Sequence, residues 1–340
     1  MTRKIDILNI GFIFISLTLA FLLPFELFIF SYVVLGPLHY LTEINWLRDR
    51  NYFVRKRRWT WLFILVCLLI AMAAIVKLPV INHYIGSSFT KSLSAINAGF
   101  YSQVILVMFL FAIGLVYFSR SLYIFLFLLG TVVAVILVNR YVSGTVILAG
   151  ILLPTIIHIF LFTLLFMILG ALNAGSKTGM LGAILLMICP LIIFFIPLDP
   201  ARYTMAMSVR SSYMASTFSN LSEYLAKLFQ PSGGGSFSLF SSAGIRIQIF
   251  IAFSYTYHYL NWFSKTSVIG WSKTLSKTKL LSVILIWICS LLLYWYDYRT
   301  GYLALFFLSL LHVMLEFPLN ITSIKGIVSR VRFPAKKTWA

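Results

Sequence analysis

The chain has 340 residues, of which 61% are hydrophobic and 10% are charged, and its formal net charge is +19. Apolar runs of about 17 or more residues recur along it with almost no charge, which is typical of membrane spans and excludes a soluble globular protein. The basic residues lie in short loops beside these runs rather than on a soluble domain, so the charge argues against a nucleic-acid partner.

Backbone polar groups inside lipid must find their hydrogen-bond partners within the same segment, so we expect the spans to be helices. The sequence therefore predicts an all-α, polytopic transmembrane bundle of about ten spans. We expect residues 1–340 to form a single integral-membrane domain. The predicted spans, in chain order, are 7–23, 25–45, 60–80, 101–118, 121–138, 144–170, 178–197, 246–264, 281–297 and 302–319.

The connections between these spans differ in length and polarity. Pro24 and Glu26 predict a turn between the first two spans, and Ser119 and Arg120 predict a tight hairpin between the fourth and fifth. A polar loop is expected between the third and fourth spans. The polar loop 198–244 contains a candidate amphipathic helix, RSSYMASTFSNLSEYLAKLF, and a flexible linker, PSGGGSFS.

The positions of lysine and arginine predict the orientation of the chain. With the N-terminus in the cytoplasm, 19 of the 27 basic side chains fall on the inner side. This places both termini in the cytoplasm and loop 198–244 outside, whereas merging the first two spans would invert the early topology. We expect a multi-pass protein of the cell (inner) membrane, with no cleaved signal peptide, because the first apolar run lacks a small-residue cleavage site.

Histidine is the residue type that stands out within the apolar runs. Four of the five histidines each lie alone in a separate predicted span: His39, His158, His258 and His312. At about 1.5 Å per residue, all but His158 lie roughly 9–10 Å from the cytoplasmic boundary, and a bend at Pro154 would bring His158 to a similar depth. The fifth, His83, lies in a predicted loop and is expected at the surface.

Three of these histidines have a polar residue close by on the same helix. Two of them are followed four residues later by a glutamate, Glu43 or Glu316, and a third is followed three residues later by Asn261. These spacings put each pair on one helix face. We expect Glu43, Glu316 and Asn261 to serve catalysis as additional ligands or as groups that orient the ligand histidines.

Four imidazoles at one depth predict a shared metal site, because ionisable groups within lipid are costly and usually functional. The alternative for each single histidine is a hydrogen bond to a neighbouring helix. Imidazole and carboxylate ligands suit iron, zinc or copper, with Fe(II) expected first. The absence of nearby thiols argues against a structural zinc site.

At these four sites the chain resembles the Brp/Blh-type membrane carotene dioxygenases, in the stretches GPLHYLTE, LPTIIHIF, TYHYLNWF and LLHVMLEF. The resemblance implies that single histidines in separate spans hold one non-haem iron, which cleaves β-carotene to retinal. His158 and His258 are 100 residues apart, a spacing similar to that of the family. Tyr40 stands where the family has a glycine, and Trp262 stands where it has a second histidine.

The leading hypothesis is a membrane-embedded, metal-dependent oxygenase that acts on a lipophilic small molecule such as a carotenoid, with the lipid bilayer around it. Five histidines with no two in one motif argue against a di-iron desaturase, and the lack of HExxH argues against a metalloprotease. Two alternatives stay open: a transporter or channel with an intramembrane His/Glu proton relay, and a haem-binding membrane protein. Nothing in the sequence assigns an oligomeric state.

Overall fold

The structure is a computed structural model, and it describes residues 2–216, 218–229, 237–265, 270 and 276–332. Throughout these residues the regular structure is helical, with no β-strand. The all-α prediction is therefore confirmed. Helices dominate because, within lipid, the backbone N–H and C=O groups of a long apolar run can form hydrogen bonds only with each other.

Within this described part, nine helical segments are long and apolar enough to span a membrane, as a multi-pass membrane protein requires. Seven of these segments contain one long helix each: α1 (Thr2–Leu22), α4 (Thr60–Ile75), α6 (Ser87–Tyr117), α7 (Ser121–Tyr141), α10 (Lys177–Phe195), α15 (Lys277–Tyr296) and α16 (Tyr298–Arg332). Two are compound: α2, η1 and α3 (Pro24–Phe30, Ser31–Leu35 and Gly36–Asp49), and α8, η4 and α9 (Ser143–Leu152, Leu153–Phe162 and Thr163–Ala174).

The eighth predicted span, 246–264, coincides with α13 (Ser242–Ser264), a helix of 23 residues. It is long enough to cross a membrane but less apolar than the nine segments above. Most of its surface is buried by protein, including polar side chains such as Gln248 and Ser254. A helix that packs against protein on all sides can carry polar groups that a lipid-facing helix cannot.

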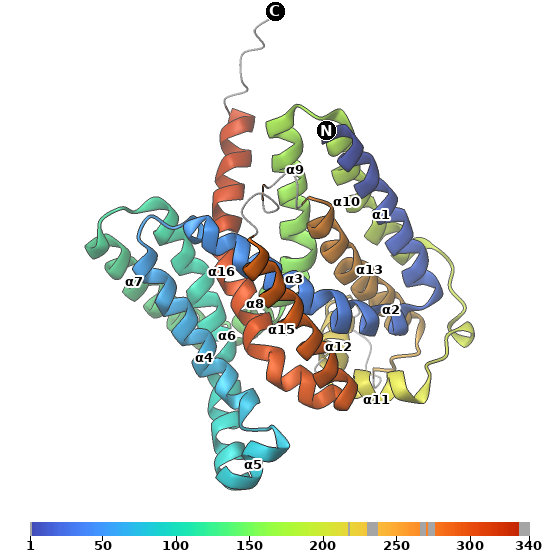
Figure 1. Cartoon of the computed structure of the whole chain (residues 1–340), viewed down its shortest axis with the longest axis horizontal. Helices are drawn as coiled ribbons and strands as arrows, with labels where there is room; N and C mark the ends of the chain where they lie inside the picture. The colour runs from blue at the N-terminus through green and yellow to red at the C-terminus, as the bar shows by residue number, and fades with distance from the viewer. Residues whose placement is uncertain (1, 217, 230–236, 266–269, 271–275, 333–340) are drawn as a thin grey trace, which may run out of the picture. The chain divides into compact units, whose positions relative to one another are not determined.

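The chain divides into two compact units. Unit 1 comprises Met1–His39 and Leu181–Leu305, and unit 2 comprises Tyr40–Met180 and Phe306–Ala340. In unit 1, α13 packs against α1, α2 and η1. Figure 1 labels α1 and α2 near α13. In unit 2, α6 packs against α4, α7 and α8.

The shorter helices lie at the ends of the long ones or in the loops. In unit 2 these are η2 (Asn51–Phe53), η3 (Arg57–Trp59) and α5 (Pro79–Ile85), and in unit 1 they are η5 (Pro200–Arg202), α11 (Met207–Ala215) and α12 (Phe218–Phe229). Within the predicted loop 198–244, α12 buries Phe218, Leu221 and Leu225 along one face and packs on α13. Residues 230–236, most of the predicted linker, lie outside the described residues.

Two predicted breaks between spans are confirmed. Helix α1 ends at Leu22 and α2 begins at Pro24, because Leu23 leaves the helical region (φ −140°, ψ 61°) and proline favours the first helical position. Helix α6 ends at Tyr117 and α7 begins at Ser121, which makes the predicted hairpin at Ser119 and Arg120.

Two helices extend beyond their predicted spans. Helix α6 begins at Ser87, inside the loop predicted between the third and fourth spans, and α16 continues to Arg332, beyond the predicted end at residue 319. Both extensions are polar, so hydropathy gives no sign of them. Helical hydrogen bonding does not require an apolar sequence outside the lipid, and these segments contain no proline to end the helix.

Gly150 marks a close approach of α8 to α6 within unit 2. A Cβ atom at Gly150 would lie 2.3 Å from the Cα of Ser102 on α6. No ordinary contact is that short, so the two helices meet through the bare backbone of this glycine. Small residues at such crossings let membrane helices gain packing energy that lipid cannot replace.

We expect Gly150→Ala to lower the free energy of unfolding by about 1–3 kcal/mol, because α8 must move away from α6. Gly144→Ala on the same helix is the matched control, since no atom lies within 4 Å of its Cβ position. Thermal unfolding of the purified chain in detergent compares the two. Equal melting temperatures for both variants would contradict the close approach.

Candidate functional site

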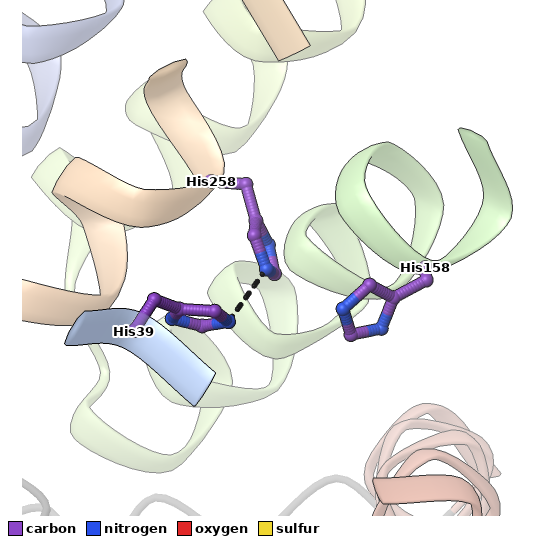
Figure 2. A group of neighbouring side chains, drawn as sticks. All are labelled: His39, His158 and His258. Atoms are coloured by element: carbon purple, nitrogen blue, oxygen red, sulfur yellow. Dashed lines mark hydrogen bonds between the residues drawn. The ribbon is translucent and has the colours of Figure 1, made fainter. Parts of the chain in front are cut away.

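His39 and His258 meet inside unit 1. His39 lies on α3 and His258 on α13, and their Nε2 atoms are 3.0 Å apart. Figure 2 shows the two rings and the hydrogen bond between them, and the ring planes are inclined at 71°. Both side chains are buried. Two histidines that lie 219 positions apart in the chain are thus within hydrogen-bond distance.

The backbone before His39 brings α3 close to α13. Gly36 has no side chain, and a Cβ there would lie 3.2 Å from the hydroxyl oxygen of Tyr259 on α13. One turn earlier, the hydroxyls of Ser31 and Thr256 share a hydrogen bond of 2.7 Å. The wide π-helical turn of η1 ends directly before Gly36, and such turns are frequent at functional sites.

Aromatic rings of α13 enclose the His39 imidazole. The ring centroids of Tyr259 and Trp262 lie 5.0 and 5.5 Å from that of His39. Asn261, one turn beyond His258 on α13, is buried, and its Oδ1 atom accepts no hydrogen bond from the described residues. The predicted catalytic role of Asn261 stays a prediction.

A second pair of histidines meets inside unit 2. The Nε2 atoms of His158 on η4 and His312 on α16 are 3.1 Å apart. The Nδ1 atom of His158 lies 3.1 Å from Oε2 of Glu316, which is one turn beyond His312 on α16. All three side chains are buried. The carboxylate and the two imidazoles therefore form one continuous polar group.

The helix around His158 departs from α geometry, as Pro154 predicts. Residues Leu153–Phe162 form a π-helix, and Thr155 within it leaves the helical region (φ −117°, ψ −105°). Pro154 supplies no backbone N–H, and the Thr155 hydroxyl donates to the Ile151 carbonyl at 2.6 Å. The wider turns change the direction of the side chains within this segment, including His158.

Glu43 and Asn320 extend the polar group of unit 2. The side chain of Glu316 lies close to Glu43 on α3 and to Asn320 on α16. The ring of Tyr40 lies against His312, with centroids 5.7 Å apart. Sequence reasoning selected Glu43 and Glu316 but missed Asn320, although its position four residues after Glu316 places both on one face of α16.

The structure thus brings the four intramembrane histidines together in two pairs, one in each unit. Their convergence on one shared ion involves both units and stays a prediction. His83, on α5, is exposed, as predicted for a surface residue. Each pair has two ring nitrogens close enough to serve one ion, and the pair of unit 2 also has a carboxylate beside it.

No family model, no curated protein and no solved structure matches this chain.

Proposed function

We propose that the protein is a metal-dependent oxygenase of the cell (inner) membrane, with a non-haem Fe(II) held by the four intramembrane histidines and a lipophilic substrate such as a carotenoid. One observation carries the proposal. In each unit two histidines from distant parts of the chain place their Nε2 atoms 3.0 or 3.1 Å apart in a buried setting.

The spacing of the nitrogens fits metal ligation. Two histidines that bind one ion at about 2.0–2.1 Å, at angles between those of octahedral and tetrahedral geometry, have nitrogens roughly 2.8–3.4 Å apart. The spacings of both pairs lie within this range. Imidazole nitrogens with carboxylates nearby suit iron, zinc or copper rather than magnesium or calcium.

Glu316 has a defined role in this proposal. Oε2 of Glu316 lies 3.1 Å from Nδ1 of His158. A carboxylate at this position favours the ring tautomer with its proton on Nδ1, so that Nε2 carries the lone pair and can bind an ion. Glu43 and Asn320 lie next to Glu316 and would help to hold it in place. The burial of these groups excludes water from the ring nitrogens.

A bound Fe(II) would supply the activation of dioxygen needed for oxidative cleavage of a lipophilic substrate. The chain supplies the ligands, their orientation and the apolar surroundings. The four short stretches similar to the Brp/Blh-type carotene dioxygenases suggest a polyene as the first substrate to test. Purified protein, loaded anaerobically with Fe(II), is incubated with β-carotene and oxygen, and the products are separated by chromatography.

The metal content of the purified protein tests this proposal directly. We expect the purified chain to retain or take up iron, as measured by elemental analysis, and to consume oxygen only when substrate is present. A preparation that contains no transition metal and takes up none on loading contradicts the proposal. Iron uptake without carotene cleavage leaves the metal site standing and rejects that substrate.

A proton relay in a transporter or channel is the second candidate, because unit 2 contains a continuous chain of polar contacts. It runs from Glu43 to Glu316, then to His158 and His312. Buried acids and histidines in such a chain can pass a proton. Metal-free protein in liposomes that carries a proton flux abolished by Glu316→Gln would favour this function over the oxygenase.

Haem binding between the histidines of one pair is disfavoured. Two histidines on opposite faces of a haem have nitrogens about 4 Å apart, twice the metal–nitrogen bond length. The spacings of 3.0 and 3.1 Å are shorter. A Soret band in the spectrum of the purified protein would contradict this argument.

A further inference from the structure

A basic pocket lies in unit 2, away from the histidines and glutamates described above. Its volume is about 390 Å³, within the range of small-molecule sites. The residues that line it come from the loop after α3, the end of α6 and the last third of α16: Phe53, Arg55, Leu115, Val116, Thr322, Lys325, Gly326 and Ser329.

The charge of this pocket is not neutralised by nearby acids. No described carboxylate lies within ion-pair distance of Arg55 or Lys325. The Lys325 ammonium lies 4.8 Å from the ring centroid of Tyr117 and so leans over the end of α6. Shortly after Arg55 in the chain, Lys56 and Arg58 both donate to the hydroxyl of Ser121, a neutral acceptor. A mobile anion would meet several cations here.

The pocket is apolar on one side and polar on the other. Leu115 and Val116 belong to the last turn of the apolar helix α6. Thr322, Lys325 and Ser329 lie on the polar extension of α16, beyond its apolar part. This combination occurs where a membrane helix leaves the hydrocarbon layer and reaches the level of the lipid headgroups.

We infer that this pocket binds the phosphate group of an anionic phospholipid. Arg55 and Lys325 provide the charge, and the Ser329 hydroxyl provides a further hydrogen bond. A phosphate can also come from a soluble ester, but the apolar wall at Leu115 and Val116 favours a phosphate attached to acyl chains. This site is independent of the proposed oxygenase function, since its lining contains none of the four histidines and neither of the two glutamates proposed for that function.

The test measures lipid binding by the full-length chain in detergent, with native mass spectrometry to count bound molecules. The probes are phosphatidylglycerol, phosphatidylcholine and glycerol 3-phosphate. We expect phosphatidylglycerol to bind most tightly. Arg55→Gln combined with Lys325→Gln should weaken it roughly 30-fold, since each cation near a membrane surface contributes about a factor of five.

The matched control is Lys91→Gln with Arg140→Gln, which removes two exposed charges from unit 2 outside the pocket. It should leave the affinity for phosphatidylglycerol within about twofold of the wild type. Ser329→Asp places a negative charge in the pocket and should weaken binding without removing a cation. If the double variant Arg55→Gln, Lys325→Gln fails to fold, Ser329→Asp provides the test in its place.

Three results would overturn the inference. The first is an unchanged affinity for phosphatidylglycerol in both the glutamine pair and Ser329→Asp. The second is an equal loss in the control pair, which would indicate general surface charge. The third is glycerol 3-phosphate binding as tightly as phosphatidylglycerol, which would assign the pocket to a soluble phosphate.

Discussion

Replacing His258 with alanine is expected to weaken Fe(II) binding by more than roughly 100-fold, since groups that merely orient metal ligands already contribute 10–100-fold. His258 supplies one of the two Nε2 nitrogens of the unit 1 pair. Without it, His39 is the one remaining histidine of that pair that can bind the ion. Competition with a coloured chelator under anaerobic conditions measures the dissociation constant.

His83→Ala is the matched control, because His83 is exposed and its replacement alters the histidine count equally. Its iron affinity should equal that of the wild type. If His258→Ala binds as much iron as His83→Ala, and as tightly, the unit 1 pair is not a metal site, and the hydrogen bond between its rings has only a structural role.

A companion variant in unit 2 decides between one shared ion and one ion for each pair. If the four histidines share an ion, His158→Ala and His258→Ala each remove all of the bound iron. If each pair binds its own ion, each variant retains the other pair's iron and the metal content falls by half. Elemental analysis of the loaded, desalted proteins measures the ratio of iron to chain directly.

Replacing Glu316 is expected to produce the largest loss of stability among the polar residues of unit 2. Glu316→Ala removes the ion-pair partner of His158 and the carboxylate beside Glu43 and Asn320. Breaking a buried group of this kind costs about 3–5 kcal/mol. Thermal unfolding in detergent should show it as a large fall in melting temperature, compared with Glu223→Ala, which breaks an exposed pair with Lys227.

Glu316→Gln separates folding from function. Glutamine has the shape of glutamate and can fill the same place beside Glu43 and Asn320, so we expect a melting temperature near that of the wild type. It no longer offers a charged acceptor to His158, so iron binding should weaken roughly 10–100-fold. Unchanged iron binding in Glu316→Gln would show that Glu316 does not orient a metal ligand.

Much of this fold is predictable from the sequence because a bilayer restricts which backbone structures and which side chains a membrane span can contain. Long apolar runs lead to helices, Pro24 leads to a break at Leu23, and Pro154 leads to an irregular turn before His158. The rarity of ionisable groups in such runs also selected the histidines, Glu43 and Glu316, all of which are buried.

Which of these residues meet was decided only by the tertiary structure. Spacing along a helix shows which side chains share a face, but lipid and protein interior are both apolar, so the sequence does not tell which neighbour that face meets. The pairing of His39 with His258 and of His158 with His312 depends on contacts between helices far apart in the chain. So does the close approach at Gly150, where the absence of a side chain matters only because α6 lies against it.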